Sequence, residues 1–169
     1  MSNFSGYIQR MLRPFMRPLV KWLLYFFYET PYTIGTGGSV LTGKKVAVSN
    51  TLFNTASGSI HIGDYTIFGH NVMVLTGRHN FVDGHRAGLK DVINGYTWGG
   101  GENEVPSSGY DIHIGVGCWI ASGAIILGGV TIGDHVIIAA NAVVTHSVPD
   151  FAIVAGVPAR VIGDTRESK

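Results

Sequence analysis

The densest group of chemically able side chains lies in a glycine-rich stretch, residues 77–111, which contains His79, His85, Trp98, Glu102 and Glu104. An imidazole near neutral pH can take the proton of an attacking hydroxyl, which is the task of a general base. His79 comes two residues after Gly77, where the regular pattern described below ends, so a rigid scaffold can fix its position. His85 lies deeper in the stretch. On position alone, His79 is a candidate catalytic residue, and a solvated loop histidine is the default alternative.

The spacing of the histidines and the lack of nucleophile motifs disfavour metal-dependent and covalent mechanisms. No His-x4-His pair occurs, and the remaining histidines form no compact ligand set: His61, His70, His113, His135 and His146. The sequence has no G-x-S-x-G elbow, no GK[ST] phosphate loop and no G-x-G-x-x-G after a strand. The single Cys118 falls on an inward position of the repeat described next, so it reads as core filler. No metal is expected.

The element that must position these groups is a repeat of period six. Branched aliphatics recur without a break at Ile114, Ile120, Ile126, Ile132, Ile138 and Val144. Four residues after each stands a small or β-branched residue: Cys118, Ala124, Val130, Val136, Ala142 and Val148. A helix has a period of 3.6 and a simple strand a period of 2, so six serves neither alone. A fixed period of this kind is typical of a solenoid of stacked coils.

The same period is weaker in the preceding block, residues 31–77, where Ile62, Phe68 and Val74 keep it. It fails at Arg78, where a small residue is due. Residues 77–111 therefore interrupt the solenoid as an extended loop, and a long loop inside a compact repeat is usually functional or disordered.

The register also predicts which outer residues stack. If three hexapeptides make one triangular coil, residues 18 apart lie over one another, as in Trp119 over Ile137, Ile125 over Val143, and Thr131 over Pro149. Two outer faces are then apolar and the third less so. Exposed apolar faces usually mean contact with a partner, and two such faces on one prism favour a closed ring of three copies.

The composition agrees with a covered solenoid. Charged residues make up 14% and glycines number 24, which suits a chain that turns many corners. The formal net charge of +1 gives no basic field, so a nucleic-acid partner is not implied. Nothing in the cysteine content excludes a reducing cytoplasm.

The N-terminal segment, residues 1–30, differs from the rest. Apolar residues at helical spacing alternate with Arg10, Arg13, Arg17 and Lys21, which predicts an amphipathic helix interrupted near Pro14 and Pro18. Its most apolar run is too short to span a membrane and no signal-peptide cleavage site follows it. Two interpretations stay open: a helical cap on the solenoid, and a basic helix in peripheral contact with an anionic membrane surface.

The motifs WIASGA, VTIGD, VTHSVP and AGVPARVI follow one another between residues 119 and 162. As a set they resemble the hexapeptide-repeat acyltransferases, of the galactoside and maltose O-acetyltransferase and xenobiotic acetyltransferase type. The resemblance covers roughly residues 34–163 and implies an all-β solenoid, a left-handed parallel β-helix. We expect the N-terminal helical segment at 1–30, the acyltransferase domain at 31–163 with its loop at 77–111, and a polar tail at 164–169.

This resemblance implies roles for particular residues. His79 matches the general base, and a backbone amide at Ser122 of a neighbouring copy matches the oxyanion donor. Acetyl-CoA is implied as the acyl donor, bound between subunits of a homotrimer. The positions matching its binding residues are Trp119, Ser122, Ala140, Thr145, Pro158 and Arg160. Many relatives carry a lysine where this chain has His146, so Arg160 is the better candidate for the nucleotide end. Asn54 resembles an acceptor-binding asparagine, and Glu104 matches a loop carboxylate that orients the base.

The resemblance therefore implies a cytoplasmic acetyltransferase that moves acetyl from acetyl-CoA to a hydroxyl of a sugar or glycan precursor, as in polysaccharide biosynthesis. N-acetyl transfer to an amino sugar, free or nucleotide-linked, and a non-catalytic β-helix scaffold are the alternatives. If the basic helix touches a membrane, the enzyme would work at its inner face on a lipid-linked glycan. The pattern does not determine the identity of the acceptor or the conformation of the loop.

Overall fold

The computed structural model describes residues 12, 14, 16–23, 30–82, 85–86 and 104–167. The chain divides into two compact units, Met1–Thr30 and Pro31–Lys169. In the first unit, residues 16–23 are helical and continue through Pro18, so the interruption predicted there is wrong. No helix among the described residues is long and apolar enough to cross a membrane. Trp98 and Glu102 lie outside the described residues.

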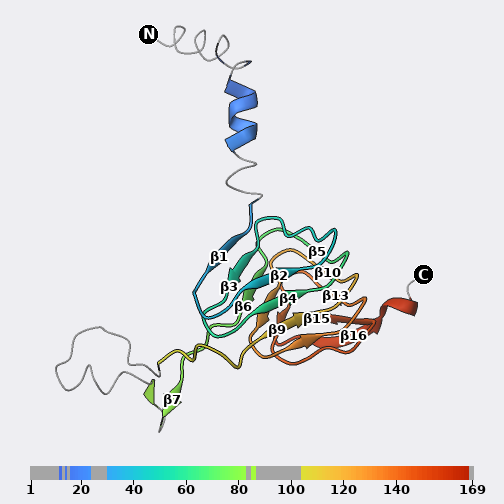
Figure 1. Ribbon diagram of the computed structural model, residues 1–169. Coiled ribbons are helices and arrows are strands. Elements are labelled where there is room, and N and C mark those ends of the chain that lie inside the picture. The colour runs from blue at the N-terminus through green and yellow to red at the C-terminus, as the bar shows by residue number, and fades with distance from the viewer. Residues whose placement is uncertain are drawn as a thin grey trace, which may run out of the picture. The chain divides into compact units, whose positions relative to one another are not determined.

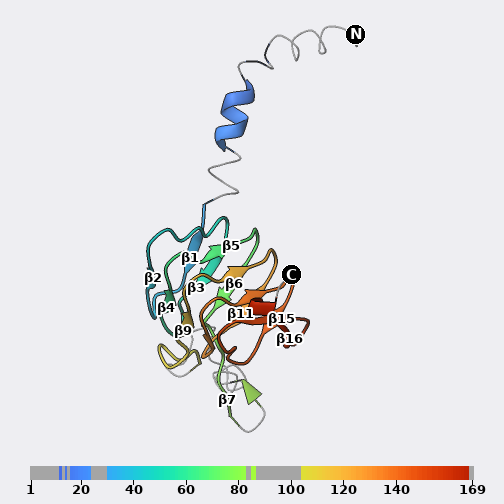
Figure 2. The same cartoon turned by 90° about the vertical axis from the view of Figure 1, so that its right-hand side faces the viewer.

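The second unit is a three-sided stack of coils whose short strands form three sheets, parallel throughout except for the antiparallel pair of β15 and β16 (Figures 1 and 2). Sheet A contains β1 (Tyr32–Ile34), β3 (Leu52–Asn54), β6 (Met73–Leu75), β11 (Ile125–Leu127) and β14 (Val143–Val144). Sheet B contains β12 (Thr131–Ile132), β9 (Ile112–Ile114), β4 (Ile60–Ile62) and β2 (Val40–Thr42). Sheet C contains β16 (Arg160–Asp164), β15 (Ala152–Ala155), β13 (Ile137–Ile138), β10 (Trp119–Ile120) and β5 (Ile67–Phe68).

The branched aliphatics of the repeat fill the interior of this stack. All six of the predicted inward residues from Ile114 to Val144 are buried, and so are Ile62, Phe68 and Val74 of the weaker block. Each pairs with its counterpart one coil away, as Ile120 does with Phe68 and Ile138. Because each coil adds a similar layer of Ile, Val or Phe side chains, the core is a continuous column of apolar side chains whose burial stabilises the fold.

Aspartates at the corners connect successive coils. Oδ1 of Asp134 accepts a hydrogen bond from the amide of Val116 at 2.7 Å, and Oδ1 of Asp64 accepts one from the amide of Lys44 at 2.8 Å. Strand pairing leaves corner amides without a ladder partner, so these carboxylates satisfy donors that would otherwise lack one. Asp64 and Asp134 thus have a structural role at the corners.

The coil length is not constant, which corrects one predicted stacking. Trp119 pairs with Ile137 and Ile125 with Val143, as expected for coils of 18 residues. Thr131 does not stack on Pro149: its amide donates to Oγ of Ser147 at 3.0 Å, and Ile132 bridges Val148. The reason is that the last coil contains only 16 residues, so Val148 moves into a strand position.

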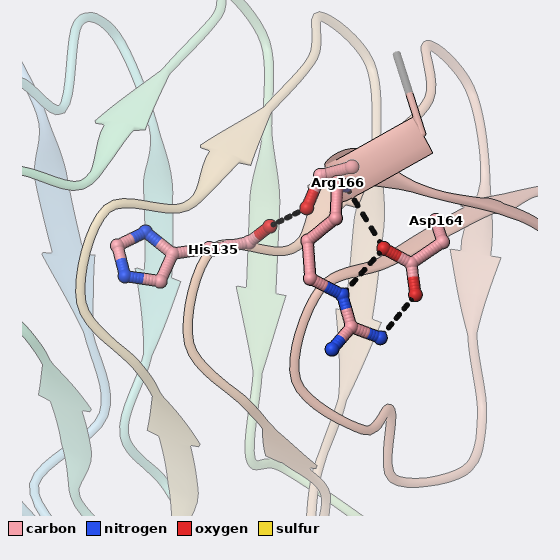
Figure 3. Close-up of polar contacts among 4 residues, drawn as sticks. His135, Asp164 and Arg166 are labelled. Atoms are coloured by element: carbon pink, nitrogen blue, oxygen red, sulfur yellow. Dashed lines mark hydrogen bonds and ion pairs between the residues drawn. The ribbon is translucent and has the colours of Figure 1, made fainter.

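The predicted loop at 77–111 contains a short antiparallel hairpin, β7 (Phe81–Val82) and β8 (His85–Arg86), which lies outside the coil stack in both views (Figures 1 and 2). At the other end of the chain, part of the predicted polar tail is ordered. Residues Thr165–Glu167 form a 3-10 helix after β16, and the Thr165 hydroxyl donates to the carbonyl of His135 (Figure 3). The Arg166 guanidinium donates two hydrogen bonds to the Asp164 carboxylate, from Nε at 2.9 Å and from Nη2 at 2.6 Å. These bonds lower the pKa of the Asp164 carboxyl to about 2.

Candidate active site

The loop leaves and rejoins the solenoid at one buried serine. The amide of Arg78, at the start of the loop, donates to Oγ of Ser57 at 3.3 Å. The amide of Tyr110, at its end, donates to the carbonyl oxygen of Ser57 at 3.1 Å. Ser57 is fully buried in the coil wall, so both ends of the loop are fixed to a rigid element. We call the described residues 78–80 and 104–110 the loop neck.

His79 and Glu104 meet across the loop neck. Nδ1 of His79 lies 3.5 Å from Oε1 of Glu104, and the amide of Asn80 donates to the backbone carbonyl of Glu104 at 2.9 Å. The His79 side chain is 50% exposed whereas that of Glu104 is 17% exposed. A largely buried carboxylate beside an accessible imidazole can orient the ring and leave its other nitrogen available to a substrate.

A hollow of about 310 Å³ lies beside the loop neck, at the carboxyl ends of the sheet A strands. Arg78, Tyr110 and Thr145 contribute to its wall. The Arg78 guanidinium carbon lies 5.3 Å from the centroid of the Tyr110 ring, a cation–π arrangement. Gly128 also lines the hollow, and a Cβ there would approach Tyr110 Cβ to 3.0 Å and the Thr76 carbonyl oxygen to 2.8 Å.

Asn54 lies at this same end of sheet A, where it pairs with Leu75. Its Oδ1 accepts a hydrogen bond from the amide of Ala56 at 2.8 Å, and its Nδ2 would be 2.8 Å from a Cβ at Gly77. The structure therefore places the predicted acceptor-binding asparagine close to the start of the loop. Its Oδ1 already accepts the hydrogen bond from Ala56, so Nδ2 is the atom closer to the loop.

The residues predicted to bind the acyl donor occupy a different corner. Ser122 and Ala140 follow the paired strands β10 and β13, so they stack in successive coils. Both are exposed, and within the described part of the chain neither backbone amide donates a hydrogen bond. The carbonyl of Ser122 accepts from the Asn141 amide at 3.0 Å, which fixes this corner to the next coil. Trp119, on β10, is 50% exposed and faces outward.

In a single chain, the structure does not bring these two groups together. Ser122 precedes β11 whereas the loop begins after β6, and β6 and β11 are parallel neighbours in sheet A. The two corners therefore lie at opposite ends of the same strands. A site that uses both His79 and the Ser122 corner needs a second copy.

The remaining predicted residues lie near the C-terminal end of the solenoid. His146 and Arg160 contribute to a hollow of about 350 Å³. The Thr145 hydroxyl lies 2.8 Å from Nδ1 of His146, and Nη1 of Arg160 donates to the carbonyl of Ala159 at 2.8 Å. Pro158 is exposed and follows a cis peptide bond.

Among the residues that the structure describes, no group of three or more His, Cys, Asp or Glu side chains could hold a metal ion. Cys118 is buried, and this burial raises the pKa of its thiol above 9.0. The thiol therefore stays protonated at neutral pH, and it faces the core instead of the surface.

Sequence reasoning missed two features of this site. The anchoring role of Ser57 has no signal in the pattern, because a buried serine looks like any small residue of the repeat. The Arg78–Tyr110 contact did have a signal, since Arg78 occupies a position where the repeat calls for a small side chain.

Comparisons with known proteins agree with this fold. The bacterial transferase hexapeptide family (six repeats) matches residues 111–146. The galactoside O-acetyltransferase of Escherichia coli K12 is 30% identical over 139 residues, which cover 74% of this chain and 64% of that protein. The serine acetyltransferase of Haemophilus influenzae is 32% identical over 108 residues, covering 64% of this chain and 38% of that protein.

Among solved structures, a hexapeptide-repeat acetyltransferase from Vibrio cholerae, complexed with acetyl coenzyme A, matches 86% of this chain and 75% of that one. The TM-score is 0.61 at 23% sequence identity, a likeness in fold. The chain spans less than two thirds of the length of the two curated relatives, at 64% and 38%.

The stacked parallel sheets and the hexapeptide match define a left-handed parallel β-helix, which confirms the predicted fold class. Residues 111–146 match the bacterial transferase hexapeptide family, as the motifs between residues 119 and 162 predicted, and the chain is similar to acetyltransferases in sequence and to a hexapeptide-repeat acetyltransferase in fold.

Proposed function

We propose that this protein is an acetyltransferase that moves acetyl from acetyl-CoA to a hydroxyl group of a sugar or glycan precursor, with His79 as general base. The contact of His79 with Glu104 across the anchored loop neck carries this proposal. The relative named galactoside O-acetyltransferase supports a sugar hydroxyl as acceptor, whereas the relative named serine acetyltransferase shows that acceptors differ within the family.

In the proposed transfer, His79 carries one proton from the acceptor hydroxyl to the sulfur of CoA. With Nδ1–H directed at Glu104, the lone pair of Nε2 takes the acceptor hydroxyl proton as its oxygen attacks the thioester carbonyl carbon. The carbon–sulfur bond breaks, and the imidazolium returns the proton to the departing thiolate of CoA. A positioned base of this kind contributes about 10²–10⁴-fold. No covalent enzyme intermediate is required, and the buried Cys118 is not available for one.

The exposed corner at Ser122 and Ala140 suits the acyl donor. Its small side chains and the amides that make no hydrogen bond among the described residues can accommodate an extended arm that carries amide groups, as pantetheine does. The same amide at Ser122 can donate to the oxyanion that develops on the carbonyl oxygen. Arg160, two residues after Pro158, would contact the nucleotide end.

A homotrimer would complete the site. Because the His79 and Ser122 corners lie at opposite ends of the sheet A strands, only neighbouring copies can place them together. The outer faces of sheets A and C expose apolar side chains, among them Ile34, Ile67 and Trp119. Burial of these two faces against neighbours is the association that a threefold ring requires.

A thiol-release assay with acetyl-CoA and a panel of sugars tests the proposal, comparing wild type with His79→Ala. His113→Ala removes an exposed imidazole from the outer face of sheet B and serves as the matched control. We expect His79→Ala to lower kcat by about 10²-fold or more and His113→Ala to leave it unchanged. Full activity in His79→Ala would remove His79 from its role. Release with amino sugars alone would indicate N-acetyl transfer, and no CoA binding by calorimetry would favour a scaffold.

We also propose that the first unit, Met1–Thr30, contacts an anionic membrane surface, so that the enzyme works at the cytoplasmic face of a membrane on a lipid-linked glycan. The described residues from Met16 to Leu23 form an exposed helix with both apolar and basic side chains, including Arg17 and Lys21. Sedimentation with liposomes that contain phosphatidylglycerol, using the intact chain and a 1–30 deletion, tests this. Pelleting of the intact chain alone is expected, and its absence would leave the helix as a cap.

A further inference from the structure

The hollow beside the loop neck is lined by a cation that the proposed mechanism does not use. Arg78 directly precedes the candidate base, and its side chain lines the hollow together with Tyr110. Within the described residues Arg78 forms no ion pair, and its only hydrogen bond is the one from its backbone amide to Ser57. The carboxylate of Glu104, on the same loop neck, lies against His79 instead.

Tyr110 positions the guanidinium, and among the described residues the side-chain donors of Arg78 make no hydrogen bond. The Arg78 guanidinium lies over the Tyr110 ring, with 5.3 Å between the guanidinium carbon and the ring centroid. The Tyr110 backbone is held at both ends, by the bond from its amide to Ser57 and by the bond from the Gly129 amide to its carbonyl, each 3.1 Å. A guanidinium that lies over an aromatic ring carries five N–H donors, and those that make no hydrogen bond within the protein can bind a carboxylate or phosphate.

We propose that Arg78, held by Tyr110, binds an anionic group on the acceptor, so that the substrate is an acidic sugar with a carboxylate or phosphate near the acetylated hydroxyl. This rests on the proposed acetyl transfer. The acceptor hydroxyl must reach His79, so the group that reaches the adjacent Arg78 belongs to the same molecule.

The acyl donor is the competing ligand for this hollow, because Thr145 lines it and is assigned to the donor. The chemistry of the donor argues against it. Its reacting thioester must also lie at His79, and the whole pantetheine arm separates that thioester from the phosphates of CoA. A cation one residue from the base is therefore placed for the acceptor and not for the CoA phosphates.

The test compares matched acceptors, galactose with galacturonic acid and glucose with glucose 6-phosphate, in the thiol-release assay on the full chain. For wild type we expect kcat/KM to be higher for the acidic member of each pair. Loss of a hydrogen-bonded charge pair corresponds to about a tenfold to hundredfold effect, so Arg78→Gln should raise KM for the acidic acceptor by that factor. Its kcat/KM for the neutral acceptor should change less than about twofold, within the effect of an ordinary surface substitution.

Lys45→Gln is the matched control, because Lys45 is also a cation over a tyrosine ring, 5.5 Å from the centroid of Tyr65. Lys45→Gln should leave kcat/KM unchanged for both the neutral and the acidic acceptor. If Arg78→Gln lowers kcat/KM equally for neutral and acidic acceptors, or raises the KM for acetyl-CoA, the proposal is overturned. If wild type transfers acetyl to no sugar, the proposed function fails, and ligand-observed NMR still decides the subsite. Galacturonate binding that Arg78→Gln abolishes supports it, and equal binding of galactose and galacturonate by wild type overturns it.

Discussion

Nδ1 of His79 lies 3.5 Å from Oε1 of Glu104, although the two residues stand near opposite ends of the inserted loop. The contact exists because the solenoid holds both ends of the loop at Ser57. The buried Ser57 of the coil thus brings together two residues that are distant in sequence.

Glu104→Gln should lower kcat by about tenfold or more, because the neutral amide no longer stabilises an imidazolium that forms during proton transfer. The KM for the acceptor should stay nearly constant. Steady-state kinetics with the preferred acceptor measure both, and Glu167→Gln, an exposed carboxylate on the C-terminal 3-10 helix, is the control. An increase in KM at unchanged kcat would instead assign Glu104 to acceptor binding.

Ile138→Ala should destabilise the fold by about 2–5 kcal/mol, since Ile138 is fully buried and lies between two coils whose contacts a cavity would remove. Thr131→Ala, on the exposed outer side of β12, should change the free energy of unfolding by less than about 0.5 kcal/mol. Urea unfolding followed by circular dichroism compares the two. Similar losses in both variants would contradict the continuous apolar core.

Trp119→Asp should dissociate the proposed trimer, because it places a charge at the centre of an apolar face beside Ile67 and Ile137. Leu41→Asp is the matched control, since Leu41 is similarly exposed but lies on sheet B. Sedimentation velocity should show a monomer for the first variant and a trimer for the second. A wild-type monomer with full activity would refute the shared site.

Cys118 should not react with a thiol reagent at pH 8 until the protein unfolds, because burial raises the pKa of its thiol above 9.0 and blocks access. The raised pKa of Cys118 also makes the free energy of unfolding depend on pH. Once the pH passes the ordinary pKa of a cysteine thiol, the unfolded chain loses the thiol proton before the folded protein does, so this group makes stability fall as pH rises. Absorbance of released thionitrobenzoate in native buffer and in guanidinium checks the first point, and rapid native labelling would contradict it.

Much of the fold was predictable because the inward and outward sides of each strand depend only on local spacing. The aliphatics from Ile114 to Val144 occupy the core as expected, and the outward pairs Trp119–Ile137 and Ile125–Val143 stack as expected. The Thr131–Pro149 pair was wrong because the last coil is shortened to 16 residues, and a change in turn length shifts every later residue. Period alone carries no information on which turn is shorter.

The sequence by itself therefore determined the class of architecture, the side of each strand that faces the core, and His79 as the candidate base. Only the tertiary structure decided what surrounds that base. The contacts of Glu104 with His79 and of Tyr110 with Arg78 join residues from the two ends of the loop, and both depend on its attachment to Ser57. Spacing along a chain fixes faces, whereas contacts between distant residues depend on how the coils and loop ends come together in space.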